Sequence, residues 1–204
     1  MTYVISDIHG EFFKFQKMLE LIEFKESDEM YILGDAVDRG KYPIRTLLYI
    51  IDHSNMKMLV GNHEVMMMKS DEDDYFKCWM NNGGDITLSQ YSNLCKDDRD
   101  KIDVYLDSLP ILYELDKYIL VHAGITKDRQ DDDFLLWARE DFLNVPTGLD
   151  KTVIFGHTPT VFMTGNRDMK IWYNDGRIDI DCGSCFTGGK LACLRLDDMK
   201  EFYV

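Results

Sequence analysis

The sequence predicts an α/β fold in which two mixed β-sheets stack face to face with helices on their outer sides, an αββα sandwich. Two observations predict it. Strand-like and helix-like segments alternate through residue 70, and such alternation is typical of parallel strands joined by right-handed crossovers. Short strand-like segments then follow His157 to the C-terminus, and we expect these to form the second sheet.

The first 70 residues read as strand, helix, strand, helix, strand. The first helix is expected at residues 11–22, because Phe12, Phe15, Met18, Leu19 and Ile22 recur at helical spacing. The second helix is expected at about 43–53, with Pro43 in its first turn. Apolar runs at residues 3–5, 30–33 and 58–60 supply the three strands.

The pattern then becomes helical from about residue 74 to 109. Asn81-Asn82-Gly83-Gly84 is typical of a helix stop and is followed by two more amphipathic segments. The chain has 204 residues, which suits one domain with a substantial core. We therefore expect a single domain, residues 1–204, with a helical insert at about 74–109.

The second half returns to strands. We expect a hairpin from residues 111–114 and 118–121, then a helix at about 134–142 that carries Arg139 on an exposed face. Further short strands are expected at 171–174, 177–181, 190–196 and 202–204, joined by the turns Asp175-Gly176 and Gly188-Gly189.

The central stretch of the chain is the loop Gly34-Asp35-Ala36-Val37-Asp38-Arg39-Gly40, between a strand and a helix. Two carboxylates so close repel each other, and the glycines cost backbone entropy. A hydrated turn could also look like this. Repetition of the pattern elsewhere favours the alternative, a loop that binds a cation.

Four other apolar runs also stop at a small residue and a side chain that can bind metal. They are Val4-Ile5-Ser6-Asp7-Ile8-His9, Leu59-Val60-Gly61-Asn62-His63, Leu120-Val121-His122 and Ile154-Phe155-Gly156-His157. Four of the five histidines fall in these loops, and only His53 does not. Parallel or mixed sheets gather the carboxyl ends of their strands along one edge. We therefore expect one metal site made by Asp7, His9, Asp35, Asn62, His122 and His157.

These motifs, in this order, resemble the motif set of the phosphoprotein phosphatase family of calcineurin-like metallophosphoesterases. The resemblance rests on Asp7-x-His9-Gly10, Gly34-Asp35-x-Val37-Asp38-Arg39-Gly40, Gly61-Asn62-His63-Glu64, His122-Ala123-Gly124 and Gly156-His157-Thr158, and it runs from Thr2 to about Leu196. The chain looks most similar to compact bacterial and phage serine/threonine phosphatases and to symmetrical diadenosine tetraphosphate hydrolases. Ser6 departs from the glycine of many members.

The resemblance implies a dinuclear phosphoesterase. Asp7, His9 and Asp35 would hold one divalent ion, and Asp35, Asn62, His122 and His157 the other, with the ions about 3.5–4 Å apart. The oxygen and imidazole ligands favour manganese, with iron, zinc, magnesium or nickel as alternatives. A hydroxide bridging the two ions would attack phosphorus in line.

The same resemblance assigns the other site residues. Arg39 and Arg139 would bind phosphate oxygens, helped by Asn62, because planar forked donors match phosphate geometry. His63, paired with Asp38, would be the general acid that protonates the leaving group. Glu64 would support the ligand loops from behind.

The substrate class is the open question. We expect phosphoserine and phosphothreonine in proteins or peptides rather than dinucleoside tetraphosphates, because the candidate rim segments 69–74 and 126–133 are acidic on balance and would repel a polyphosphate. A metal-binding scaffold without turnover is the alternative from another class. The intact Asp38, Arg39 and His63 argue against it.

Composition excludes several other functions. The formal net charge is −14, and no basic stripe offers a nucleic-acid footprint. Because no apolar run approaches membrane-spanning length and no signal-peptide pattern precedes the first strand, we expect a cytoplasmic monomer without membrane contact. Cys182-x-x-Cys185 ends a strand-like run instead of opening a helix, which favours core cysteines over redox chemistry.

Overall fold

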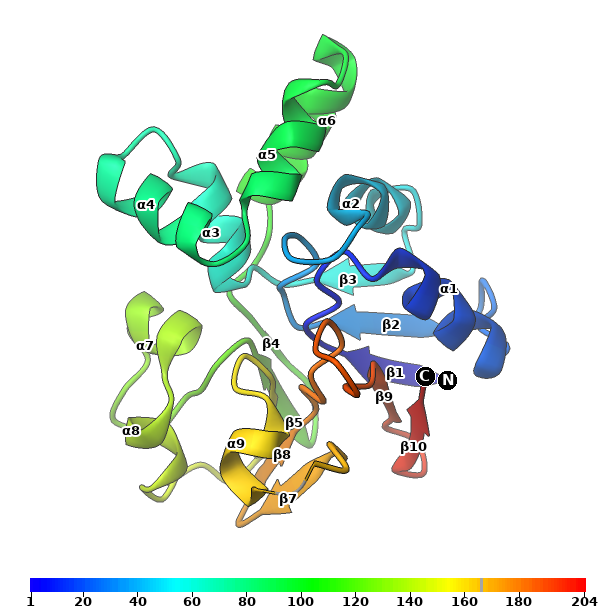
Figure 1. Cartoon of the computed structure of the whole chain (residues 1–204). Helices are drawn as coiled ribbons and strands as arrows, with labels where there is room; N and C mark the ends of the chain where they lie inside the picture. The colour runs from blue at the N-terminus through cyan, green and yellow to red at the C-terminus, as the bar shows by residue number, and fades with distance from the viewer. Residues whose placement is uncertain (166) are drawn as a thin grey trace.

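The computed structural model describes residues 1–165 and 167–204. Two five-stranded mixed sheets stack on each other, and helices cover their outer faces (Figure 1). The αββα sandwich expected from the sequence is confirmed.

The first sheet has the strand order β10-β9-β1-β2-β3. Its strands are β1 (Thr2–Ile5), β2 (Glu29–Ile32), β3 (Met56–Met58), β9 (Ala192–Arg195) and β10 (Lys200–Tyr203). The first three are parallel and are joined by α1 (Phe12–Leu21) and α2 (Pro43–Ile51), so the βαβαβ opening is confirmed. The strands β9 and β10 are antiparallel to their neighbours.

The second sheet has the order β4-β5-β6-β8-β7. Its strands are β4 (Leu112–Glu114), β5 (Tyr118–Val121), β6 (Thr152–Phe155), β7 (Trp172–Asn174) and β8 (Arg177–Asp179). The expected hairpin of β4 and β5 is confirmed. The expectation that all strands after His157 belong to this sheet is wrong, because β9 pairs with β1. That pairing covers a sheet edge that would otherwise leave its backbone groups exposed.

Alternation along the strands divides the core into layers. Tyr3 and Ile5 of β1 pack with the helices outside the first sheet, including Phe15 of α1. Val4, between them in sequence, packs with residues of both sheets, including Ile154 of β6. This period of two is what a strand buried on both faces requires.

The segment expected as an insert is helical, and its helices lie at the top of the view in Figure 1. After α3 (Asn62–Met68) come α4 (Asp73–Asn81), α5 (Asp85–Ser92) and α6 (Lys96–Asp107). The stop between α4 and α5 falls at the expected asparagines and glycines. Trp79, Ile102 and Leu106 anchor the segment in the same core as Met66 and Met67 of α3.

The expected continuous helix at 134–142 is wrong. The structure has α7 (Asp132–Trp137) and α8 (Glu140–Leu143), with Arg139 between them at φ −137° and ψ −111°. The Leu135 carbonyl, which a continuing helix would use, instead accepts a hydrogen bond of 2.9 Å from the Ala123 amide. The Arg139 amide donates to the Asp141 carboxylate at 3.0 Å. Tertiary and capping bonds therefore replace the helical ladder here.

One short helix, α9 (Thr160–Thr164), follows β6. Across residues 1–165 and 167–204, we find no helix with the length and apolarity needed to span a membrane.

Candidate active site

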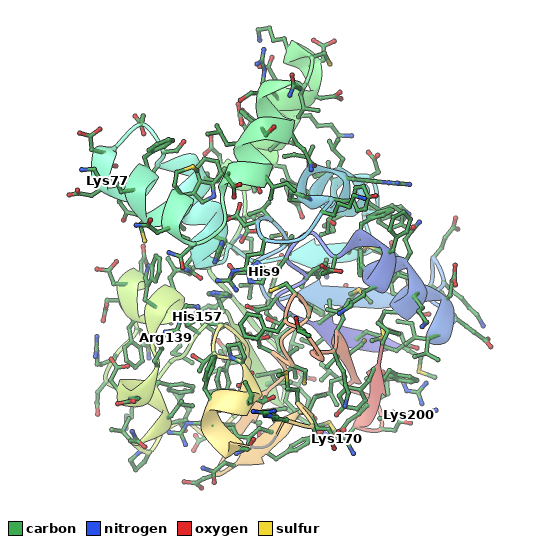
Figure 2. The ribbon with its side chains drawn as sticks, in the orientation of Figure 1. His9, Lys77, Arg139, His157, Lys170 and Lys200 are labelled. Carbon is green, nitrogen blue, oxygen red and sulfur yellow. The ribbon has the colours of Figure 1, made fainter. Side chains whose placement is uncertain are left out.

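The structure brings all six expected metal ligands together where strands of both sheets end. These residues are Asp7, His9, Asp35, Asn62, His122 and His157, and each is at most 6% exposed. Figure 2 shows His9, which follows β1 of the first sheet, close to His157, which follows β6 of the second. The convergence therefore uses strand ends of two sheets, not one edge of a single sheet as the sequence led us to expect.

Four of these six residues have a strained backbone. The φ angles are +49° for Asp7, +46° for His9, +54° for Asp35 and +68° for His157. Residues with side chains rarely adopt this left-handed region, and such strain concentrates at functional sites. All four residues lie within four positions of the end of a strand.

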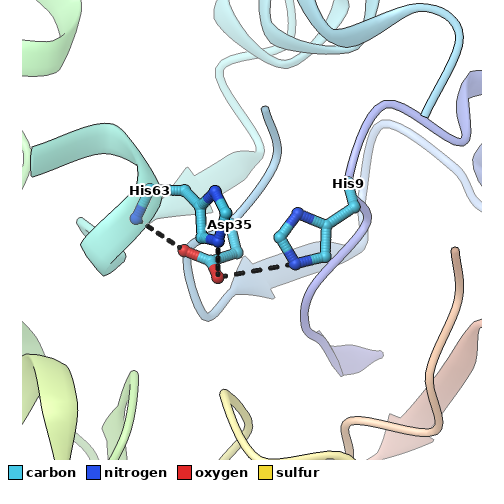
Figure 3. Close-up of side chains that lie close together, drawn as sticks. All are labelled: His9, Asp35 and His63. Carbon is cyan, nitrogen blue, oxygen red and sulfur yellow. Dashed lines mark hydrogen bonds and ion pairs between the residues drawn. The ribbon is translucent and has the colours of Figure 1, made fainter. Parts of the chain in front are cut away.

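Asp35 lies between two groups of imidazoles. Its Oδ2 is 3.6 Å from His9 Nε2 and 3.9 Å from His63 Nε2 (Figure 3). Its Oδ1 is 3.5 Å from His122 Nε2. One carboxylate therefore faces both groups through different oxygens, which is the geometry a bridging ligand needs.

The remaining expected ligands complete these two groups. Asp7 Oδ1 lies 3.9 Å from His9 Nε2. Asn62 Oδ1 lies 2.8 Å from His122 Nε2 and 3.1 Å from His157 Nδ1. The six residues therefore form the two groups that the sequence predicted, and Asp35 belongs to both. The assignment of these groups to two ions stays a prediction.

The far ring nitrogens of two histidines are fixed by backbone carbonyls. His9 Nδ1 donates to the Val37 carbonyl at 2.9 Å, and His122 Nδ1 donates to the Leu33 carbonyl at 2.8 Å. With the proton held on Nδ1, the Nε2 lone pair points into the site. This arrangement orients metal-binding imidazoles in proteins.

The electrostatics of the site fit a bound cation. Burial, and then the charges of Asp7 and Glu64, raise the pKa of Asp35 well above its ordinary value. Burial also lowers the pKa values of His9 and His157 well below theirs. Neutral imidazoles and crowded buried carboxylates, with no thiolate among the expected ligands, suit divalent ions that take nitrogen and oxygen ligands.

Glu64 supports the central loop from behind, as expected. Its Oε2 accepts backbone N–H groups of Asp35 at 2.8 Å and Gly61 at 3.0 Å. Its Oε1 accepts those of Ala36 at 2.9 Å and Val37 at 3.3 Å. The carboxylate is fully buried, so it fixes the strained turn that carries Asp35.

The expected acid pair is also assembled. His63 Nδ1 lies 2.5 Å from Asp38 Oδ2, and both side chains are buried. Burial raises the pKa of Asp38 to about 7 and lowers that of His63 well below its ordinary value. Asn62 and His63 open helix α3, so the expectation that they lie in a loop is wrong. The distance of His63 Nε2 from Asp35 also permits a ligand role, as the group of His9, Asp35 and His63 shows.

Two arginines reach the site from different elements. Arg39 donates to His9 Nε2 and to His63 Nε2, at 2.9 Å each. Arg139 donates to the Thr158 hydroxyl at 3.1 Å, and Figure 2 shows it beside His157. Arg139 lies in the break between α7 and α8, so the expectation that a helical face carries it is wrong. Its side chain nevertheless lies near the site, as expected.

The sequence interpretation missed several side chains around the site. Asp181 is fully enclosed, and burial followed by the charge of Asp7 raises its pKa well above the ordinary value. Trp79 and Thr87 bind Asp38 from the insert. The sequence signal for Asp181 was its place in the alternation Ile178-Asp179-Ile180-Asp181, where acidic residues follow apolar ones, and Trp79 looked like an ordinary core residue.

A two-sheet sandwich with a buried oxygen and imidazole cluster at its strand ends is suited to metal-dependent hydrolysis. The family model for calcineurin-like phosphoesterases matches residues 2–187. The chain therefore belongs to the calcineurin-like phosphoesterase family, and it is a metal-dependent phosphoric ester hydrolase. The expected resemblance is confirmed.

Relatives in this family carry two kinds of name. A symmetrical bis(5′-nucleosyl)-tetraphosphatase from Vibrio campbellii is 27% identical and is matched over 89% of this chain and 72% of its own length. Serine/threonine-protein phosphatase 2 from Salmonella typhimurium is 28% identical over 95% of this chain and 92% of its own.

Solved structures show the same fold. A crystal structure described as a candidate diadenosine tetraphosphatase superposes with a TM-score of 0.72 at 18% identity, covering 100% of this chain and 92% of its own. A protein serine/threonine phosphatase from Saccharomyces cerevisiae superposes with a TM-score of 0.63 at 17% identity, covering 100% and 78%.

Proposed function

We propose that this phosphoesterase hydrolyses phosphoserine and phosphothreonine in proteins or peptides. The observation that carries the proposal is the buried pair of His63 and Asp38, 2.5 Å apart. Serine and threonine leave as alkoxides, which are strong bases and need a proton as the ester bond breaks. An acid beside the phosphate is therefore most useful for this class of ester.

The expected ligand set remains the basis of the mechanism. Asp7, His9 and Asp35 would hold one divalent ion; Asp35, Asn62, His122 and His157 would hold the other. Bound there, the ions would supply a nucleophilic water at neutral pH and offset phosphate charge. Manganese is the ion we favour, for the nitrogen and oxygen ligands.

The chain's own residues position the ester. Arg39 already lies over the cluster, with its guanidinium 2.9 Å from two imidazole nitrogens. Arg139, from the break between α7 and α8, donates a hydrogen bond to the Thr158 hydroxyl, next to His157. Two forked cations on different sides would fix the phosphate oxygens, and Asn62 would add an amide donor. When Arg39 binds the phosphate in place of His63 Nε2, His63 could carry a proton on Nε2 and pass it to the departing oxygen, while Asp38 stabilises the imidazolium.

The acidic segments expected at the rim of the site suit a peptide with basic side chains. The Tyr75 hydroxyl, and then the Glu72 and Asp133 carboxylates, raise the pKa of Lys69. Both expected rim segments therefore contribute negative charge around Lys69. Their negative charge would attract a cationic peptide and repel a polyphosphate.

A second candidate substrate is a dinucleoside tetraphosphate, as the name of the Vibrio relative suggests. One observation favours it. A cavity of about 500 Å³ adjoins Arg139 and Thr158, and its lining includes Trp172, Phe162 and Asn144. Aromatic rings and an amide beside a phosphate-binding arginine could hold a nucleoside.

One comparison tests both candidates. We would measure kcat/KM for a phosphothreonine peptide and for diadenosine tetraphosphate on one manganese-loaded preparation. The proposal expects the peptide to be preferred, and a clear excess for the dinucleotide would reverse it.

The variant His63→Asn sharpens the comparison. Turnover of the peptide should fall by about 10²–10⁴-fold, whereas p-nitrophenyl phosphate, with its weakly basic leaving group, should lose much less. Metal content should stay unchanged. Loss of metal would make His63 a ligand, and equal losses on both substrates would remove it from the acid role.

A further inference from the structure

The helical insert binds the carboxylate of the acid pair through two buried side chains. Trp79 Nε1, from α4, lies 2.8 Å from Asp38 Oδ2 and 3.0 Å from Oδ1. The Thr87 hydroxyl, from α5, donates to Asp38 Oδ1 at 2.5 Å and accepts from the Asp38 amide at 3.0 Å. All three residues are at most 1% exposed, so no bulk water can replace these donors.

The turn between α4 and α5 holds this contact in place. The Gly83 carbonyl accepts the Arg39 amide at 3.1 Å, directly after Asp38. A Cβ at Gly84 would lie 2.5 Å from the Trp79 indole. Only a glycine at position 84 lets the backbone of the turn pack this closely against the Trp79 ring. The ring is therefore held between the turn and Asp38.

We propose that Trp79 and Thr87 are positioning residues for leaving-group protonation. They hold the Asp38 carboxylate in one orientation, and the carboxylate holds the His63 ring 2.5 Å away with Nε2 toward the site. Without these donors the carboxylate is free to rotate, and the imidazole loses its alignment. The insert then has a role in the chemical step, although α4, α5 and α6 supply none of the expected metal or phosphate ligands. The inference rests on the acid role proposed for His63.

The test uses two variants that keep most of the side-chain volume. Thr87→Val removes the hydroxyl, and Trp79→Phe removes the indole N–H. We expect each to lower kcat for a phosphothreonine peptide about tenfold or more, since small misplacements of a catalytic group cost up to about 10²-fold. The kcat for p-nitrophenyl phosphate and the metal content should stay within about twofold of the wild type, because this leaving group needs little protonation.

Two controls separate positioning from structural support. Thr87→Ser keeps the hydroxyl and should restore peptide turnover. Tyr91→Phe removes a hydroxyl from the same helix, α5. This hydroxyl binds Asp103, away from Asp38, so the kcat values for both substrates should stay unchanged. Equal losses on both substrates, or no loss on the peptide, would overturn the inference.

A double variant distinguishes two outcomes: that Trp79 and Thr87 have no positioning role, and that His63 is not the general acid. If Thr87 acts through His63, adding Thr87→Val to His63→Asn costs no further peptide turnover; an additive loss contradicts the inference. If His63→Asn alone shows no dependence on the leaving group, the acid assignment fails, and the inference with it. If His63→Asn shows that dependence and the Thr87 and Trp79 variants do not, only the positioning role fails. Should Trp79→Phe not fold, Thr87→Val and Thr87→Ser decide the question.

Discussion

Replacing Glu64 by glutamine should destabilise the protein and release its metal, because the carboxylate satisfies four buried backbone N–H groups at 2.8–3.3 Å. Glutamine offers one oxygen, so two of these donors would face an NH₂ group instead. A buried donor without an acceptor costs about 1–3 kcal/mol, and two cost roughly 2–6 kcal/mol. We expect a loss near the middle of this range, about 4 kcal/mol.

The assay is urea unfolding of the EDTA-treated protein, followed by tryptophan fluorescence, with metal content measured separately on the loaded protein. The matched control is Glu20→Gln on the exposed face of α1, which should change the free energy of unfolding by less than about 0.5 kcal/mol. A Glu64→Gln variant within about 1 kcal/mol of the wild type, with its metal retained, would refute the argument that this carboxylate holds the Asp35 turn.

Four further predictions concern the same site. Asp35→Asn should remove most metal and nearly all activity, because one carboxylate faces both ligand groups; two ions by elemental analysis with full turnover would contradict this. Gly61→Ala should also abolish metal binding, since its Cβ would lie 2.3 Å from Asp35 Oδ1, and a normally loaded variant would count against this geometry. Arg139→Ala should lower kcat/KM about 10- to 100-fold, by loss of a charged hydrogen bond to phosphate, and unchanged kinetics would exclude it from phosphate binding. Finally, the raised pKa of Asp35 makes its own contribution to the stability of the metal-free protein fall as pH rises, whereas the lowered pKa values of His9 and His157 oppose that fall up to about pH 6.5, the ordinary histidine value. Above about pH 6.5 the unfolded histidines are neutral and the carboxyl contribution remains, so the stability should fall there. Melting curves with EDTA should show this fall and metal should suppress it; a flat metal-free profile would be the contrary result.

The sequence by itself determined the chemistry and the order of the site. An apolar strand that ends in a polar residue is a local pattern, so Asp7, Asp35, His122 and His157 could be predicted to lie together without a three-dimensional structure. The first five elements followed from periodicity for the same reason. The pairing of His63 with Asp38 was expected from the resemblance, and the structure assembled it.

Tertiary structure decided which elements meet. The strands β9 and β10 joined the first sheet because β1 offered a free edge, which no local pattern records. The break at Arg139 depends on the Ala123 amide taking the Leu135 carbonyl, twelve residues away. The contacts of Trp79 and Thr87 with Asp38 span 41 and 49 residues. Long-range hydrogen bonds of this kind leave no periodic trace in the sequence, because each depends on how whole elements pack against one another.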